Sequence, residues 1–312
     1  MPKKISIGVV MIVKNEEEML ARALDSAKGV DSITIVDTGS EDSTVEIAKK
    51  YTKKVHFFKW IDHFGKARQY SKDQCKSDWI ITLDADEVLE TPVDKIREFV
   101  EKADKEGYVF VDTRVVPEGS EKVEGAGNWF PRIYKNIPEI TWHGAAHNYL
   151  AFNGESASTV GKSIKSDIRI IYGYSPAHKK DPERTLRILK AAVEGNPELT
   201  RERYYLAREY FYRKNFAKAL EHLDEYVKRS NFPGEKADAY MMRAYCLSGM
   251  RRYLDGCRSA MEALLLNANF KEALLFLSNH MGPGNKIAWK RYADSATNEG
   301  ILFVRDVENA NK

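Results

Sequence analysis

The segment from Ile5 to Val13 restricts the fold more than any other stretch of the chain. It is β-branched and apolar on both of its faces, as a strand is when other elements cover it on both sides. Three more strand-like segments follow at 33–36, 55–60 and 79–83, and segments with helical spacing lie between them at 17–28, 43–50 and 64–75. This alternation predicts a doubly wound α/β layer built on a largely parallel sheet.

Polar loops follow three of these predicted strands. They are Lys14–Glu16, Asp37–Asp42 and Asp84–Glu87. The carboxyl ends of parallel strands meet at one edge of a sheet, and ligands bind there in open α/β folds. We therefore expect the three loops to form one binding rim.

The second half of the chain changes character. Residues 108–175 indicate a mixed α+β extension with strands near 108–111, 130–134 and 168–172, whereas the chain is helical from Asp181 to about Asn298. The pattern around Tyr205–Leu220 recurs about 37 positions later in a degenerate form, which is typical of tetratricopeptide-like helical hairpins. We expect two domains, an α/β domain over 1–178 and an all-α helical-repeat domain over 179–312.

Composition excludes several classes of protein. With 49 basic and 46 acidic residues the formal net charge is +3, which lacks the strong basic bias of a dedicated nucleic-acid binder. The cysteines Cys75, Cys246 and Cys257 form no CxxC pair and are expected to be free thiols. No apolar run reaches the roughly 18 residues of a membrane span and no secretory signal is visible, so we expect a soluble, cytoplasmic protein.

Three motifs in a fixed order carry a family resemblance. The stretches Val10–Glu16, Ile35–Thr44 and Asp78–Glu87 resemble glycosyltransferase family 2, which has the GT-A fold, a Rossmann-like mixed sheet. The helical tail beginning at Tyr205 resembles the repeat tail of members of this family. The resemblance implies a hexosyltransferase that moves a sugar from a nucleoside-diphosphate sugar, expected to be a UDP-sugar such as UDP-glucose, to an acceptor hydroxyl with inversion at the anomeric carbon.

The Asp84-Ala85-Asp86 motif is the core of the expected donor site. Two carboxylates at a strand end can share a hard divalent cation, Mn²⁺ or Mg²⁺, which neutralises the donor diphosphate and stabilises the leaving group. An isolated Asp-x-Asp is more often a solvated turn, but here it directly follows the apolar strand that ends at Leu83. By resemblance Asp86 is the direct ligand, Asp84 contacts the ribose or the cation through water, and His178 is a candidate for a third ligand.

The resemblance assigns further residues to the donor pocket. They lie after the first two strands and on the helix before the fourth: Val13, Asn15, Glu16, Asp37, Thr38, Gly39, Lys66 and Arg68. Simpler interpretations are a helix cap for Asn15, a plain turn for residues 38–40, and a solvated helix face for Lys66 and Arg68.

The acceptor side departs from the family pattern. Relatives carry Pro-Arg followed later by His and an acidic residue. Here Arg132 matches the first motif and Trp142 precedes the second, but Asn148 replaces the acid, and an amide takes no proton near neutral pH. The general base is then expected among His147, His143 and Glu139, although a lone histidine is about as often structural.

A second departure concerns the cation. Relatives carry a histidine before Gly-Tyr near the end of the catalytic domain, and Ile171 stands at that position here.

Several alternatives remain open at this level. The acceptor is a glycan, a protein or peptide, or a modified nucleobase. The helical domain either binds the acceptor or a protein, or packs as a structural element that forms a homodimer. Finally, the departures at Asn148 and Ile171 favour a second class of function, a catalytically weak nucleotide-sugar-binding scaffold.

Overall fold

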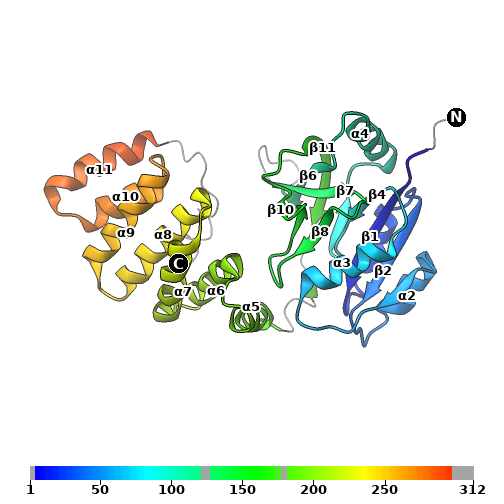
Figure 1. The fold of residues 1–312 in the computed structure, drawn as a ribbon, viewed down its shortest axis with the longest axis horizontal. Coiled ribbons are helices and arrows are strands. Elements are labelled where there is room, and N and C mark those ends of the chain that lie inside the picture. The colour runs from blue at the N-terminus through cyan, green and yellow to red at the C-terminus, as the bar shows by residue number, and fades with distance from the viewer. Residues whose placement is uncertain (1–3, 121–126, 174, 177–180, 297–312) are drawn as a thin grey trace. The chain divides into compact units, whose positions relative to one another are not determined.

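The structure is a computed structural model that describes residues 4–120, 127–173, 175–176 and 181–296. The chain divides into two compact units, Met1–Pro182 and Glu183–Lys312 (Figure 1). No helix among these described residues is long and apolar enough to cross a membrane.

The first unit is built on an eight-stranded mixed sheet with the strand order β3-β2-β1-β4-β7-β6-β11-β5. Strands β1–β4 are mutually parallel, β7 is antiparallel to both β4 and β6, and β5 is antiparallel to β11. The strands are β1 (Ile7–Val13), β2 (Ser32–Asp37), β3 (Val55–Phe57), β4 (Trp79–Thr82), β5 (Glu87–Leu89), β6 (Phe110–Pro117), β7 (Asn128–Lys135) and β11 (Ser163–Tyr172). A small antiparallel sheet holds β8 (Ile140–His143), β9 (Tyr149–Phe152) and β10 (Glu155–Ser156).

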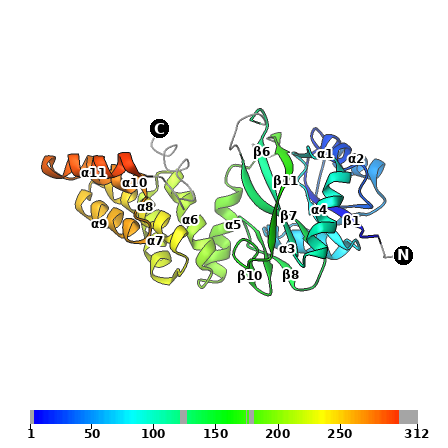
Figure 2. The ribbon, with the colours of Figure 1, turned by 90° about the horizontal axis from the view of Figure 1, so that it is seen from above.

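The expected alternation of strands and helices is present in β1 to β4. Strand β1 is covered on both faces, as its sequence predicts, because successive residues pack into two different cores. Helices α1 (Leu20–Ser26), α2 (Thr44–Tyr51) and α4 (Val93–Lys105) pack on one face of the sheet, and α3 (Phe64–Gln74) with the small sheet covers the other (Figure 2). Helix α4, strand β5 and the small sheet were not foreseen from the sequence.

Strand β7 contains an irregularity beside the rim. Ile133 pairs with Val111 and Phe130 pairs with Thr113, so Pro131 and Arg132 lie opposite the single residue Asp112. This is the geometry of a β-bulge, and proline, which has no N–H to give to the ladder, is tolerated there. The extra residue changes the direction in which Arg132 points.

The second unit is all-helical. Helix α5 packs on α6, and antiparallel pairs follow as α6–α7, α8–α9 and α10–α11 (Figure 1). The helices are α5 (Arg184–Gly195), α6 (Thr200–Tyr212), α7 (Phe216–Arg229), α8 (Pro233–Gly249), α9 (Tyr253–Leu266), α10 (Lys271–His280) and α11 (Pro283–Ser295). Helices α7 and α9 begin 37 positions apart, in agreement with the repeat expected from the sequence.

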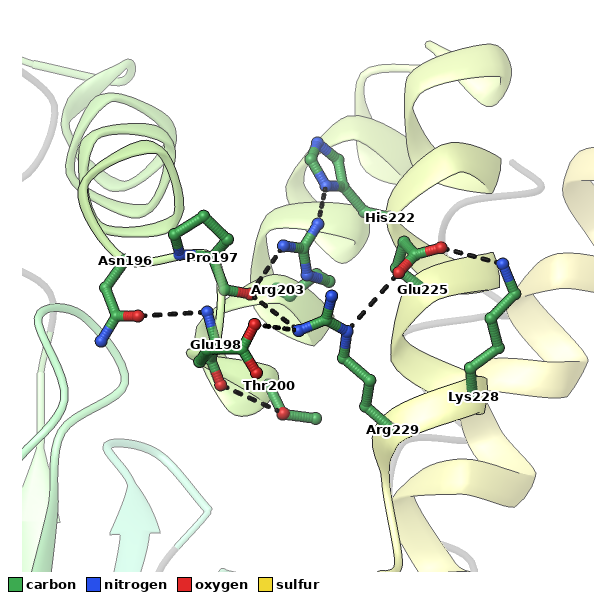
Figure 3. Close-up of polar contacts among 9 residues, drawn as sticks. All are labelled: Asn196, Pro197, Glu198, Thr200, Arg203, His222, Glu225, Lys228 and Arg229. Atoms are coloured by element: carbon green, nitrogen blue, oxygen red, sulfur yellow. Dashed lines mark hydrogen bonds and ion pairs between the residues drawn. The ribbon is translucent and has the colours of Figure 1, made fainter.

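Arginine side chains fix the α5–α6 connection to α7 (Figure 3). The carbonyl oxygen of Pro197 accepts hydrogen bonds from Arg203 at 2.8 Å and Arg229 at 3.3 Å, and Arg229 also pairs with Glu198 at 2.8 Å. A carbonyl that accepts from two guanidinium groups is well satisfied. These contacts hold the first hairpin together at the start of the repeat region.

Candidate active site

Hydrogen bonds join the loops after β1 and β2 at the carboxyl edge of the sheet. Asn15 lies at φ 56, a left-handed conformation that asparagine tolerates. Its N–H donates to Ser40 Oγ at 2.9 Å, and its side-chain oxygen accepts from the Glu41 N–H at 2.8 Å. Thr38 donates to the carbonyl of Val13 through both its N–H and its hydroxyl. Asn15 therefore braces the rim rather than capping a helix.

Asp37 is buried at the end of β2, and its carboxylate shapes the turn that follows. It accepts the N–H of Gly39 at 3.1 Å and of Ser40 at 3.0 Å, while Gly39 adopts φ 106, which favours glycine. A carboxylate has about four acceptor positions, so Asp37 keeps capacity for a ligand hydroxyl. The turn and the ligand-binding interpretation of residues 37–39 are thus compatible.

Two arginines converge on Asp84. Its carboxylate lies 2.7 Å from Arg68 on α3 and 3.5 Å from Arg132 on β7. Burial alone would raise the pKa of Asp84, but the two guanidinium groups hold it well below its usual range. Asp84 is therefore ionised, and its carboxylate forms ion pairs with two arginine side chains at the rim.

Glu87 is a buried member of the same cluster. Its carboxylate accepts the N–H of Asp84 at 2.9 Å and pairs with Arg132 at 2.5 Å. Burial raises the pKa of Glu87, against the opposing pull of Arg132. The bulge at Pro131–Arg132 is what brings the arginine between the two carboxylates. Arg132, expected on the acceptor side, thus pairs with Glu87, which no sequence motif singles out.

Glu16 adds a further carboxylate from the end of β1. Burial raises its pKa to about 7, a hydrogen bond from Ser175 at 2.6 Å works against this, and the charges of Asp86 and Asp84 add to the rise. Carboxylates that repel one another across a rim suit a cation bound between them. All of these possible metal ligands are oxygen atoms, which Mg²⁺ and Mn²⁺ prefer.

Few protein ligands are available for such a cation. Within the described part of the chain no three His, Cys, Asp or Glu side chains lie close enough to hold one metal ion together. His178, the candidate third ligand, lies outside the described residues. Ile171, at the position where the family resemblance led us to expect histidine, is almost fully buried and pairs with Val88. Mg²⁺ commonly takes one or two carboxylates and fills its remaining positions with phosphate and water, so the residues present fit it.

The loop 143–148 docks on the first turn of α3. The N–H groups of Phe64 and Gly65 donate to the carbonyls of Ala145 at 2.8 Å and Gly144 at 3.0 Å. The approach is so close that a Cβ on Gly65 would lie 2.6 Å from the oxygen of Gly144. This places His143 and His147 at the same rim as the start of α3, which also carries Lys66.

Trp142 packs against Arg68, a second basic residue of α3. Its ring centroid lies 5.2 Å from the guanidinium carbon of Arg68, a cation–π contact. Its backbone N–H donates to Gln69 at 2.9 Å, and its indole N–H donates to the hydroxyl of Tyr134 at 3.2 Å. Trp142, expected on the acceptor side, therefore lies against Arg68, the partner of Asp84.

The candidate bases are separated by the fold. His143 is exposed and bonded to Thr141 at 2.9 Å, and His147 lies at φ 48 next to Asn148. Glu139 instead lies before β8, where its charge acts on Lys72 near the end of α3. Because β7 runs antiparallel to β4 and ends beside Trp79, the chain reaches Glu139 at the amino edge of the sheet, away from the rim.

Comparisons with known proteins agree with this geometry. Residues 8–154 match the family model described as glycosyl transferase family 2. An uncharacterized glycosyltransferase of Rickettsia typhi is 41% identical over 28% of this chain and 29% of that protein. A TPR repeat-containing protein of Synechococcus elongatus is 32% identical over 45% of this chain and 34% of that protein. The chain spans about three tenths of the length of the Rickettsia relatives it matches.

A solved structure shows the same fold. S. aureus TarS 1–349 in complex with UDP-GlcNAc has a TM-score of 0.50 and 13% identity, with 85% of this chain and 92% of that chain covered. The mixed sheet followed by helices is thus the GT-A type of architecture with an α-helical C-terminal region, as the sequence indicates. Within the first unit, residues 8–154 therefore form a domain that matches glycosyl transferase family 2.

Proposed function

We propose that this protein transfers a hexose from a UDP-sugar such as UDP-glucose to an acceptor hydroxyl, with inversion and with a divalent cation, Mn²⁺ or Mg²⁺, at Asp86. The observation that supports this most is the rim itself. Ends of three parallel strands bring Asp37, Glu16 and the Asp84–Asp86 loop together, and Arg68 and Arg132 lie beside that loop. This combination suits a nucleoside diphosphate, because the carboxylates can bind a cation and the guanidinium groups can neutralise negative charge on the phosphates.

Each side chain has a distinct task in this proposal. When bound, the cation would supply charge neutralisation of the diphosphate, with Asp86 as the direct ligand and Asp84 as an outer contact. Arg68, held in place by Asp84 and Trp142, would stabilise the negative charge that develops on the leaving group. Asp37 and Asn15 would fix the ribose and base through the acceptor capacity that their loop contacts leave.

The acceptor half rests on the docked loop 143–148. We propose His147 as the base that takes the acceptor proton, with His143 as the alternative on the same loop, because Glu139 lies at the other edge of the sheet. A histidine with a pKa near 6.5 can accept a proton at neutral pH. The acceptor classes are a glycan, a protein or a modified nucleobase, and the three buried free cysteines support work in a reducing cytoplasm.

The decisive experiment is a thermal-shift and calorimetry panel of UDP-, GDP-, CMP- and dTDP-sugars with Mn²⁺. Stabilisation by one donor class is expected, since a ligand that binds the native state raises apparent stability. Asp86→Ala should abolish metal-dependent binding of the nucleoside diphosphate, and unchanged affinity in that variant would refute the assignment. His147→Ala should lower the transfer rate more than donor affinity, whereas an equal effect on both would mark a structural histidine.

A second function is favoured by two observations. Asn148 replaces an acid, and the buried Ile171 replaces a histidine at the end of β11. A protein that binds a UDP-sugar with metal but gives neither transfer nor hydrolysis with any donor in the panel would be a nucleotide-sugar-binding scaffold. Turnover with any donor excludes that function.

A further inference from the structure

The outer face of α9 exposes an apolar stripe in the helical unit. Leu254, Met261 and Leu265 lie seven and four positions apart, so they fall on one side of the helix together with Arg258. Leu254 and Leu265 are 75% and 80% exposed, more than any other large apolar side chain in the described ranges. The opposite side of α9 is the one that packs on α8 and α10, through the small buried residues of the helix. Leu254 and Leu265 are therefore outside the repeat core, whereas Met261 between them is partly buried and packs against it.

Helix α7 provides an internal comparison. Helices α7 and α9 are both 14 residues long and begin at Phe216 and Tyr253, 37 positions apart. The positions of α7 that correspond to the stripe are Ala217, Glu221, Asp224 and Lys228. On α7 this face is thus mostly charged, and Lys228 forms an ion pair with Glu225 at 2.8 Å (Figure 3). The repeat fold does not need apolar side chains on this face. We therefore infer that another protein surface covers the stripe on α9.

The stripe is complementary to itself. When two copies of α9 are laid side by side in opposite directions, Leu254 of each copy falls opposite Leu265 of the other. The same register brings Arg258 of one copy next to Glu262 of the other, and both side chains are exposed. An isologous dimer requires a surface that matches itself under a two-fold rotation, and this one does so in both shape and charge.

We propose that the outer face of α9 is a homodimer interface in which two copies of this chain pair antiparallel through Leu254 and Leu265, with reciprocal Arg258–Glu262 ion pairs. One helix pair buries less than the roughly 1,600 Å² of a standard interface, so the dissociation constant should lie in about the micromolar range. The proposed interface uses no residue of the rim, and its existence does not depend on the proposed transfer reaction.

Sedimentation equilibrium on the full chain over a concentration series tests the interface. The wild type should move from monomer to dimer as concentration rises. Leu254→Glu with Leu265→Glu should remain monomeric, because each copy would have to bury two acidic groups, four in the whole interface. The matched control, Ala217→Glu with Lys228→Glu on α7, should dimerise like the wild type. A wild type that stays monomeric throughout, or a stripe variant that still dimerises, overturns the proposal.

A charge exchange tests the antiparallel register without adding charge to the apolar positions. Arg258→Glu alone and Glu262→Arg alone should each weaken the dimer at least several-fold, because each places like charges opposite one another. The double variant restores opposite charges and should recover wild-type association. Circular dichroism checks that each variant keeps its helix content. Singles that dimerise normally, or a double variant that fails to recover, would show that the helices do not pair in this register.

Discussion

A single methyl group at Gly65 is expected to separate the loop 143–148 from α3. In Gly65→Ala the new Cβ would lie 2.6 Å from the oxygen of Gly144 and 3.0 Å from the carbonyl carbon of His143, whereas ordinary contacts begin at 3.4 Å. Both neighbours are backbone atoms, so no side chain can rotate away. The two segments must move apart by about 0.8 Å, which follows from these distances.

The magnitude follows from the bonds that join the two segments. Hydrogen bonds of 2.8 Å from Phe64 and 3.0 Å from Gly65 would lengthen beyond the usual range for N–H···O bonds. At about 0.5–1.5 kcal/mol each, their loss costs about 1–3 kcal/mol. The higher helix propensity of alanine would offset at most about 1 kcal/mol of this loss in the free energy of unfolding. We expect a net loss of about 1–2 kcal/mol in the free energy of unfolding of the first unit.

Urea unfolding followed by tryptophan fluorescence measures this loss, because four of the five tryptophans (Trp60, Trp79, Trp129 and Trp142) lie in the first unit. Gly195→Ala is the matched control, since a Cβ on Gly195 meets nothing within 4 Å at the end of α5. We also expect Gly65→Ala to lower transfer, because the loop carries the candidate base. A variant as stable and as active as the wild type would refute the close approach of the loop to α3.

Two further predictions concern buried ionisable groups. Arg132→Met leaves Glu87 without its guanidinium partner, so we expect it to destabilise the first unit by up to about 3–5 kcal/mol. Arg132→Lys should cost less, and adding Glu87→Gln to Arg132→Met should recover part of the loss. Urea midpoints of the wild type, the two single variants and the double variant measure these differences. In the helical unit, burial raises the pKa of Glu235, which accepts a hydrogen bond from Tyr226 at 2.7 Å. A carboxyl with a raised folded-state pKa stabilises the fold at low pH and loses that contribution as pH rises from the ordinary value of 4.5 through the raised one. The wild type should therefore lose stability relative to Glu235→Gln across this window, and parallel pH profiles of the two melting temperatures would contradict the shift.

The convergence of the candidate donor residues on one rim could be predicted from local sequence, because parallel strands determine where the loops lie. Once β1, β2 and β4 are recognised, their carboxyl ends must meet, and Asn15, Asp37 and Asp84 follow. The partners of Asp84 could not be predicted in the same way. Arg132 reaches it only through a one-residue bulge, and register irregularities of this kind leave little local signal beyond a proline in a strand.

The acceptor half shows the same limit. Glu139 lies only four positions from His143 in sequence, yet it belongs to the opposite edge of the sheet. The distinction depends on the direction of β7, which is antiparallel to β4 although nothing in its own sequence indicates that direction. The pairing direction of a strand is a tertiary property, because side-chain alternation is the same in both orientations.

The hydrogen bond from Ser175 to Glu16 has a consequence for how the protein matures. It joins residues 159 positions apart, and the neighbouring Gly173 donates its N–H to the carbonyl of Asp86 at 2.8 Å. Chains emerge from the ribosome at about 5–20 residues per second with the N-terminal part first. The strands that carry Asn15, Asp37 and Asp84 would thus be available for several seconds before the segment that completes their rim. A nascent chain stalled before Gly173 could assemble most of the sheet but would lack both of these hydrogen bonds, so the rim is complete only when the ribosome has passed the end of the first unit.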